Sequence, residues 1–99
     1  MTAGDQQIIP GISLSTSGHA TVDPSLSDVL FDYAIQLEEA TNLPVDVEHA
    51  LAAIVLAARK GELDPNTKLT IGNSAIHLLL IPHVRTVFAV FGGEVGQED

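Results

Sequence analysis

The chain has no cysteine and no tryptophan, and only 4 of its 99 residues are lysine or arginine. Without cysteine there is no disulfide framework, no thiolate metal ligand and no cysteine nucleophile. The 4 basic residues stand against 13 acidic ones, which gives a formal net charge of −9. Because nucleic-acid affinity comes mainly from lysine and arginine that neutralise phosphates, this composition argues against nucleic-acid binding. The length fits a single small domain.

Long apolar runs are also missing. The longest covers residues 50–58, between His49 and Arg59, which is well short of the roughly 20 residues that a membrane-spanning helix needs. The first residues lack the basic and hydrophobic segments of a signal peptide. We therefore expect no membrane partner and a cytoplasmic location. The mean hydropathy is nevertheless positive, at +0.28, which predicts a folded chain, because disordered acidic chains combine charge with low hydrophobicity.

The first of two well-marked helices is predicted over residues 24–41. Asp23 is a good N-cap residue, and Pro24 is tolerated at the first helical position. Asn42 tolerates the left-handed backbone conformation of a helix end, so the helix is expected to stop there. Apolar residues recur at the spacing of one helix face, at Leu26, Val29, Leu30, Tyr33, Ala34, Leu37 and Ala40.

The second helix is predicted over residues 46–60. Asp46 is its expected N-cap, and Gly61 follows the last turn as a terminating residue. Residues 50–58 are apolar on every side, which on a helix indicates burial all round. We therefore expect this to be the central helix.

The last third of the chain fits either helix or strand. Residues 76–81 and 84–91 are rich in Ile, Leu, Val and Phe, and their β-branched residues favour strands. Helical spacing after Pro82 favours a helix that begins there, with Gly92 and Gly93 ending it. We predict an all-α fold, a small bundle of four to five helices with an irregular N-terminal arm. The alternative is α+β, with the two helices packed on a small sheet formed by the C-terminal third, joined by residues 12–16.

The N-terminal arm is predicted over residues 1–22, ahead of a single helical domain at 23–99. The arm is rich in Ser, Thr and Gly, and Asp5 is its only charged residue. Pro10 and Gly11 indicate a turn. We expect the arm to be flexible or docked, and docking would use Ile8, Ile9, Ile12 and Leu14.

Catalytic and metal-binding motifs are not found in the sequence. There is no nucleophile elbow, no phosphate-binding glycine loop and no zinc-type histidine pair on a helix. His77 and His83 stand six residues apart, with no acidic residue within four positions of either. We therefore predict no catalytic residues, no metal and no cofactor, and the sequence favours a protein without enzymatic activity. An enzyme stays open as an alternative if subunits share a site built from Asp32, Glu38, Asp46 or His49.

One short motif offers another alternative. Residues 23–26 read Asp-Pro-Ser-Leu, which is similar to the Asp-Ser-Leu attachment motif of acyl carrier proteins. This resemblance implies a carrier-type domain modified at Ser25. The chain departs from the family because Pro24 separates the aspartate from the serine. It also lacks room for the helix that the family places before the motif.

The acidic residues are distributed unevenly. Residues 23–48 hold seven carboxylates and no lysine or arginine. At about 100° per residue, Phe31 and Ile35 form an apolar pair on the outer face of the first helix. Carboxylates stand on both sides of this pair, at Asp28, Asp32, Glu38 and Glu39. An apolar anchor with a charged rim is typical of small interaction sites, although another part of the chain covering the pair would explain it equally well.

These features together predict a small acidic protein-protein interaction or regulatory module. We expect a protein partner of basic character and self-association as a homodimer, because the chain offers more apolar surface than a small monomer readily buries. The predicted partner-binding residues are Phe31, Ile35, Asp28, Asp32, Glu38 and Glu39.

Overall fold

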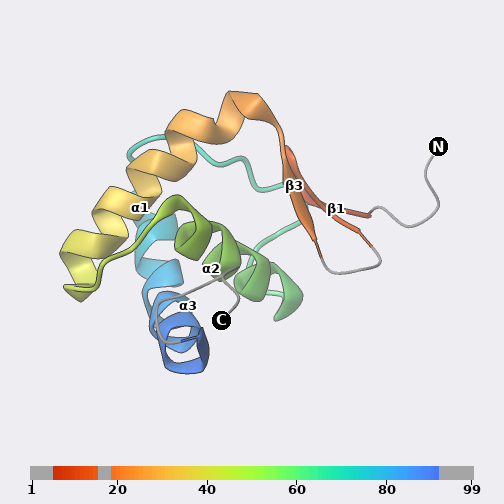
Figure 1. Cartoon of the computed structure of the whole chain (residues 1–99). Helices are drawn as coiled ribbons and strands as arrows, with labels where there is room; N and C mark the ends of the chain where they lie inside the picture. Colours follow the sequence, from red (N-terminus) through yellow and green to blue (C-terminus); the bar gives the residue numbers. More distant parts are fainter. Residues whose placement is uncertain (1–5, 16–18, 92–99) are drawn as a thin grey trace.

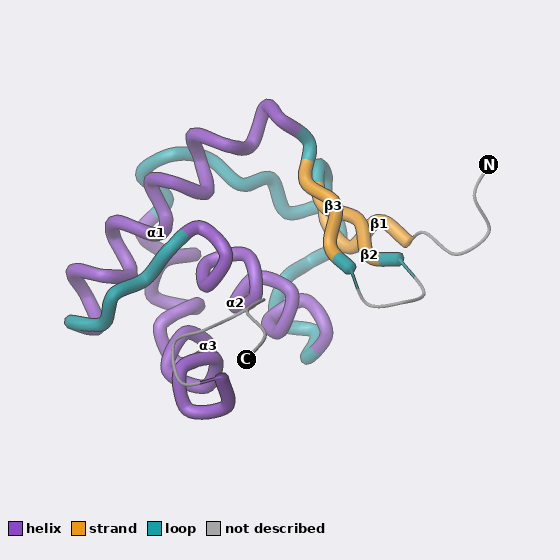
Figure 2. Tube along the Cα trace, in the orientation of Figure 1, coloured by secondary structure: helices purple, strands orange, loops and turns teal. Residues whose placement is uncertain are grey.

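The computed structural model of the chain describes residues 6–15 and 19–91 (Figure 1). The described residues form an α+β fold, with a small antiparallel sheet at one end and the helices packed together at the other (Figure 2). The elements are β1 (Gln6–Ile9), β2 (Ile12–Leu14), β3 (Ala20–Val22), the 3-10 helix η1 (Pro24–Leu26), α1 (Ser27–Thr41), α2 (Val47–Arg59) and α3 (Ser74–Phe91).

The prediction of an all-α bundle is therefore wrong, and the α+β alternative fits. The strands do not come from the C-terminal third, however. They come from residues 6–22, in the order β1-β2-β3. Residues 1–5 of the expected arm and the expected helix stop at Gly92 and Gly93 lie outside the described residues.

The turn between β1 and β2 explains why these residues form a hairpin. Ile9 pairs with Ile12 across Pro10 and Gly11, and Gly11 has a φ of 92°, as in a turn with proline before a left-handed glycine. A Cβ atom at Gly11 would lie 2.5 Å from the Leu26 side chain. The positive φ is the reason for glycine here, because the end of the flexible Leu26 side chain can move aside.

The sheet contributes directly to the core. Ile9 and Ile12 are completely buried and belong to the same cluster as buried residues of all three helices. Successive side chains of a strand point to opposite faces of the sheet, and these two lie on the face toward the helices. The residues expected to dock the arm thus include two core residues.

The first helix starts later than predicted, because Pro24–Leu26 form the 3-10 helix η1 and α1 begins at Ser27. Asp23 caps η1, and its carboxylate accepts a hydrogen bond from the Ser25 amide at 2.9 Å. The predicted end of the first helix is confirmed, because Asn42 ends α1 with a φ of 63°. Asp46 and His49 form a reciprocal capping box at the start of α2.

The expectation that α2 is buried on every side is wrong. His49, Ala50, Ala53, Ile54 and Ala57 are buried, whereas Leu51, Ala52, Val55 and Leu56 are only half-buried.

The last third forms one continuous helix, α3, which runs through Pro82. A proline inside a helix removes one backbone hydrogen bond and costs about 3 kcal/mol. Leu80, Val84 and Val87 are completely buried on both sides of the proline, and they share one face of the helix. Burial of each such side chain contributes about 1.5–3 kcal/mol, so the continuous core face outweighs the lost hydrogen bond.

The loop between α2 and α3 passes beside the sheet before it reaches the start of α3 (Figure 2). Leu63 and Leu69 anchor it in the core. Among the described residues, no helix is long and apolar enough to cross a membrane.

Candidate interaction surface on helix α1

Helix α1 turns one face to the core and the other to solvent. Leu30, Tyr33, Ala34 and Leu37 are buried on the inner face. Phe31 is 60% exposed and Ile35 is 41% exposed. These two side chains stand four residues apart, so they are neighbours on the helix surface. The described residues therefore leave the predicted apolar pair open to solvent.

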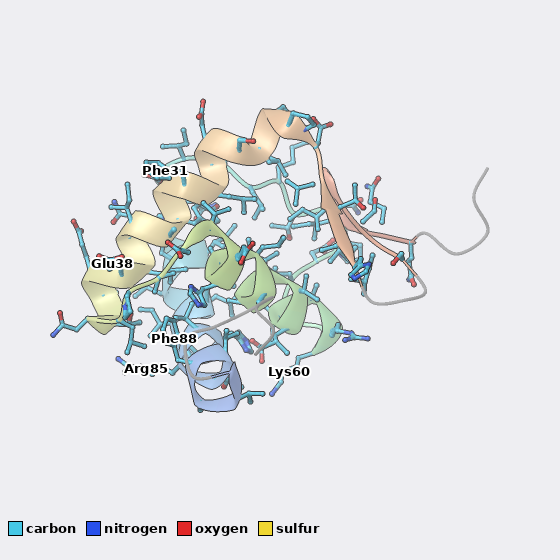
Figure 3. All side chains as sticks on the ribbon, in the orientation of Figure 1. Phe31, Glu38, Lys60, Arg85 and Phe88 are labelled. Carbon is cyan, nitrogen blue, oxygen red and sulfur yellow. The ribbon has the colours of Figure 1, made fainter. Side chains whose placement is uncertain are left out.

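The carboxylates around this pair are also accessible. Asp28, Glu38 and Glu39 are exposed. Within residues 6–15 and 19–91, no lysine or arginine forms a salt bridge with them. Figure 3 shows Phe31 and Glu38 along α1, Arg85 on α3 and Lys60 at the end of α2. These three carboxylates are thus unpaired among the described residues.

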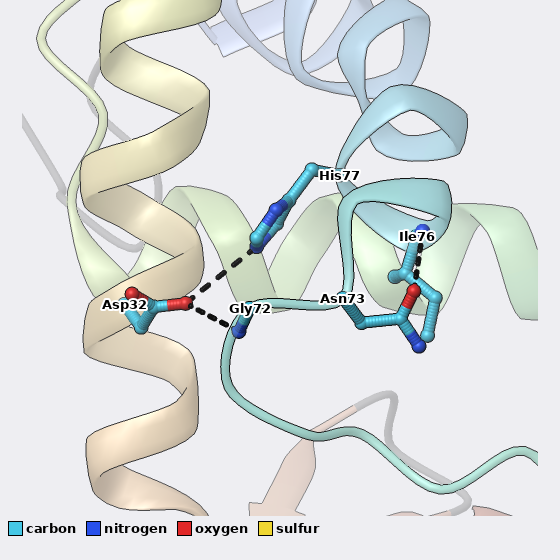
Figure 4. A network of polar contacts seen from close by, with 5 residues as sticks. All are labelled: Asp32, Gly72, Asn73, Ile76 and His77. Carbon is cyan, nitrogen blue, oxygen red and sulfur yellow. Dashed lines mark hydrogen bonds and ion pairs between the residues drawn. The ribbon is translucent and has the colours of Figure 1, made fainter.

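Asp32 differs from the other predicted rim residues because it is tied to the fold. Its Oδ2 atom accepts a hydrogen bond from the Gly72 amide at 3.2 Å and lies 3.7 Å from Nε2 of His77. The contact to Gly72 joins α1 to the loop before α3 (Figure 4). Gly72 has a φ of 81°, a conformation that glycine adopts readily. Asp32 therefore fixes the loop and also borders the apolar pair.

His77 and Tyr33 pack against each other beneath Asp32. Their ring centroids are 4.4 Å apart in an edge-to-face arrangement. Burial lowers the pKa of His77, and the Asp32 carboxylate opposes that shift. Burial also raises the pKa of Tyr33, opposed by the Thr70 backbone and reinforced by Asp32.

Two polar atoms in this cluster have no hydrogen-bond partner within the described part of the chain. They are Nε2 of His77 and the hydroxyl of Tyr33. Both atoms are closed to solvent, so they are not accessible to a substrate. Burial of polar atoms without partners costs free energy, so this cluster stabilises the packing of α1 on α3 less than a fully hydrogen-bonded one would.

The other two buried histidines have structural contacts. His49 accepts a hydrogen bond from the Asp46 amide at 2.9 Å and stacks on Phe88 with centroids 4.5 Å apart. Nε2 of His83 lies 2.6 Å from the Glu62 carboxylate. Asp46 and His49, proposed for a shared enzymatic site, thus cap α2. Among the residues that the structure describes, no three His, Cys, Asp or Glu side chains converge on a metal-binding position.

Ser25, the residue of the carrier alternative, lies at a cleft beside the sheet. The cleft has a volume of about 250 Å³ and is lined by Pro10, Gly11, Asp23, Ser25, Leu26, Lys68 and Leu69. Hydrogen bonds from the backbone and side chain of Ser25 lower the pKa of Asp23. Modification of Ser25 stays a prediction, and the intact mass of protein from its native source tests it.

Sequence reasoning missed the contacts that join distant segments. Asp32 and Gly72 are 40 residues apart, and His83 and Glu62 are 21 apart. No local pattern marks such pairs. The role of His49 in the α2 cap had a local signal, because it stands three residues after the N-cap Asp46, where a side chain can reach back to the cap.

Comparisons of the chain with protein-family models, with curated proteins and with solved structures found no match.

Proposed function

We propose that this protein is a small acidic interaction module that binds a basic protein segment through the outer face of α1. Phe31 and Ile35 are the apolar anchors, and Asp28, Glu38 and Glu39 form the charged rim, with Asp32 at its edge. The observation that carries the proposal is the exposure of an adjacent aromatic and aliphatic pair among carboxylates that are unpaired within the described residues. The cytoplasm stays the expected location.

Charge selects the class of partner. Residues 23–48 contain seven carboxylates and no lysine or arginine. A second copy placed symmetrically on this face would bring the same carboxylates together, because a two-fold interface pairs a patch with itself. A segment that carries lysine or arginine beside an apolar side chain complements both the rim and the anchors.

A defined peptide tests this proposal. The probe is an amphipathic helix of about 18 residues, since shorter isolated helices are marginally stable, with leucine on one face and lysine on the other. We expect binding in calorimetry, with an affinity that falls as salt increases from about 50 to 200 mM because exposed charges are screened. A peptide with glutamate in place of lysine is the control and is expected not to bind.

The double variant Phe31→Glu, Ile35→Glu separates an anchored complex from simple charge attraction. It adds two carboxylates and changes the formal charge from −9 to −11. If attraction between net charges were the whole effect, the variant would bind the basic peptide more tightly. Because the anchors are lost, we expect it to bind more weakly by about tenfold or more. Leu78→Glu, Val90→Glu is the matched control, because it adds the same charge at side chains 67% and 68% exposed on α3.

The proposal would be wrong if the two double variants bound the peptide equally well. It would also be wrong if the α1 variant bound more tightly than the unmodified protein. Circular dichroism and thermal unfolding of each variant establish that the fold is intact, which is expected because the substituted side chains are exposed.

A further inference from the structure

The outer face of α3 carries exposed and mostly apolar residues from Ala75 to Val90. Leu78 is 67% exposed and Val90 is 68% exposed. At about 100° per residue, six exposed residues fall within roughly a third of the helix circumference. They are Ala75, Leu78, Pro82, Thr86, Ala89 and Val90, and the exposed Ser74 and Arg85 lie outside this sector.

This face differs from the rest of the protein in its charge. Helix α3 contains no aspartate or glutamate, and Arg85 is its only lysine or arginine. The chain as a whole has a formal charge of −9. At about 100° per residue, Arg85 lies at the border of the apolar residues, where its head group stays in water.

We infer that α3 is a self-association surface, on which the occupant is a second copy of this chain related by a two-fold axis. In a two-fold interface, the same surface patch of each subunit faces that of the other. Two copies of a strongly acidic protein repel each other where carboxylates meet, and the α3 face contributes none. Helix α3 itself offers a basic segment no carboxylate, and the carboxylates in contact with it, Asp32 and Glu62, already face His77 and His83.

The side chains on this face suit helix-to-helix contact. Ala75, Leu78, Pro82 and Ala89 follow spacings of three, four and seven residues along α3, which is the spacing of a helix contact line. Alanine allows the backbones to approach closely, while Leu78 and Val90 supply the apolar area. Burial of these residues removes the largest exposed apolar side chains of α3 from water.

The expected dimer is weak. An 18-residue helix is about 27 Å long, and one side of it buries an area at the low end of the range for specific interfaces, below about 1,200 Å² in total. We therefore expect reversible dimerisation with a dissociation constant on the order of micromolar to tens of micromolar. The α1 anchors Phe31 and Ile35 lie on a different helix, so separate substitutions test the two surfaces.

Sedimentation equilibrium over a range of protein concentrations tests the inference. We expect the unmodified protein to change from one chain to two as its concentration rises. Leu78→Glu, Val90→Glu should remain a single chain, with a dissociation constant raised at least about tenfold, because burial of unpaired charges is costly. Phe31→Glu, Ile35→Glu adds the same charge on α1 and should still dimerise.

A variant of opposite charge shows whether the glutamate variant weakens the dimer only through repulsion between negative charges. Leu78→Lys is expected to weaken the dimer as the glutamate variant does, because it also places a charge on the contact line. Three results would overturn the inference: one chain at every concentration of the unmodified protein, a dimer unaffected by either change at Leu78, or a dimer lost only in the α1 variant. Peptide binding at α1 is measured separately, so failure of the dimer leaves the proposed function intact.

Discussion

Replacement of Ile12 by alanine tests whether the N-terminal residues are part of the core. Ile12 is completely buried between the sheet and the helices. The substitution removes three carbon atoms, which corresponds to about 2.4 kcal/mol at roughly 0.8 kcal/mol per buried methylene. The cavity left behind adds to this cost, and measured Ile→Ala changes in cores lie at about 2–5 kcal/mol. We expect the free energy of unfolding to fall by about 3 kcal/mol.

Urea unfolding monitored by circular dichroism measures this change. The midpoint should move to lower urea while the slope stays the same, since the surface exposed on unfolding is nearly unchanged. Ile71→Ala is the matched control, because the same atoms are removed from a side chain that is 61% exposed, and it should cost less than about 1 kcal/mol. Equal and small changes in the free energy of unfolding at the two positions would refute the assignment of Ile12 to the core. They would favour an N-terminal arm that is only loosely attached.

Three further predictions concern the helix ends and the buried histidine. Asn42→Gly should preserve or raise stability, whereas Asn42→Ala should lower it by about 1 kcal/mol in urea unfolding, because φ is positive there; equal stabilities would contradict this. Asp46→Ala should cost about 1 kcal/mol through loss of the α2 cap, and an unchanged midpoint would argue against that cap. Burial lowers the pKa of His77 in the folded protein, so the unfolded chain takes up that proton at a higher pH. The free energy of unfolding should therefore fall as the pH drops below about 6.5. His77→Phe should weaken that dependence, and an unchanged pH profile would count against it.

Local signals predicted the helices that have clear ends. Asn42 and Asp46 act within a few residues of their own positions, and each occupies the expected cap in the structure. Asp23 caps the 3-10 helix η1, which precedes α1. The exposed pair on α1 was also predictable, because helical periodicity alone separates Phe31 and Ile35 from the core-facing residues.

The N-terminal sheet and the continuous helix α3 were not predicted, because the structure of these residues depends on tertiary contacts. Pro82 is a strong local signal for a helix boundary, yet Leu80 and Val84 are buried on the two sides of it and hold one continuous helix. The turn at Pro10 and Gly11 was visible in the sequence, but β1 and β2 are short strands. Only their burial against the helices distinguishes them from an arm.

The most direct test of the proposed function is a residue-level map of where a basic segment binds. Isotope-labelled protein is titrated with the leucine-lysine peptide, and amide signals are followed by nuclear magnetic resonance. The account predicts that the signals shifting most belong to α1 around Phe31 and Ile35, and that the shifts are lost in Phe31→Glu, Ile35→Glu. Shifts centred on α3 or on the cleft at Ser25, with α1 unchanged, would contradict it.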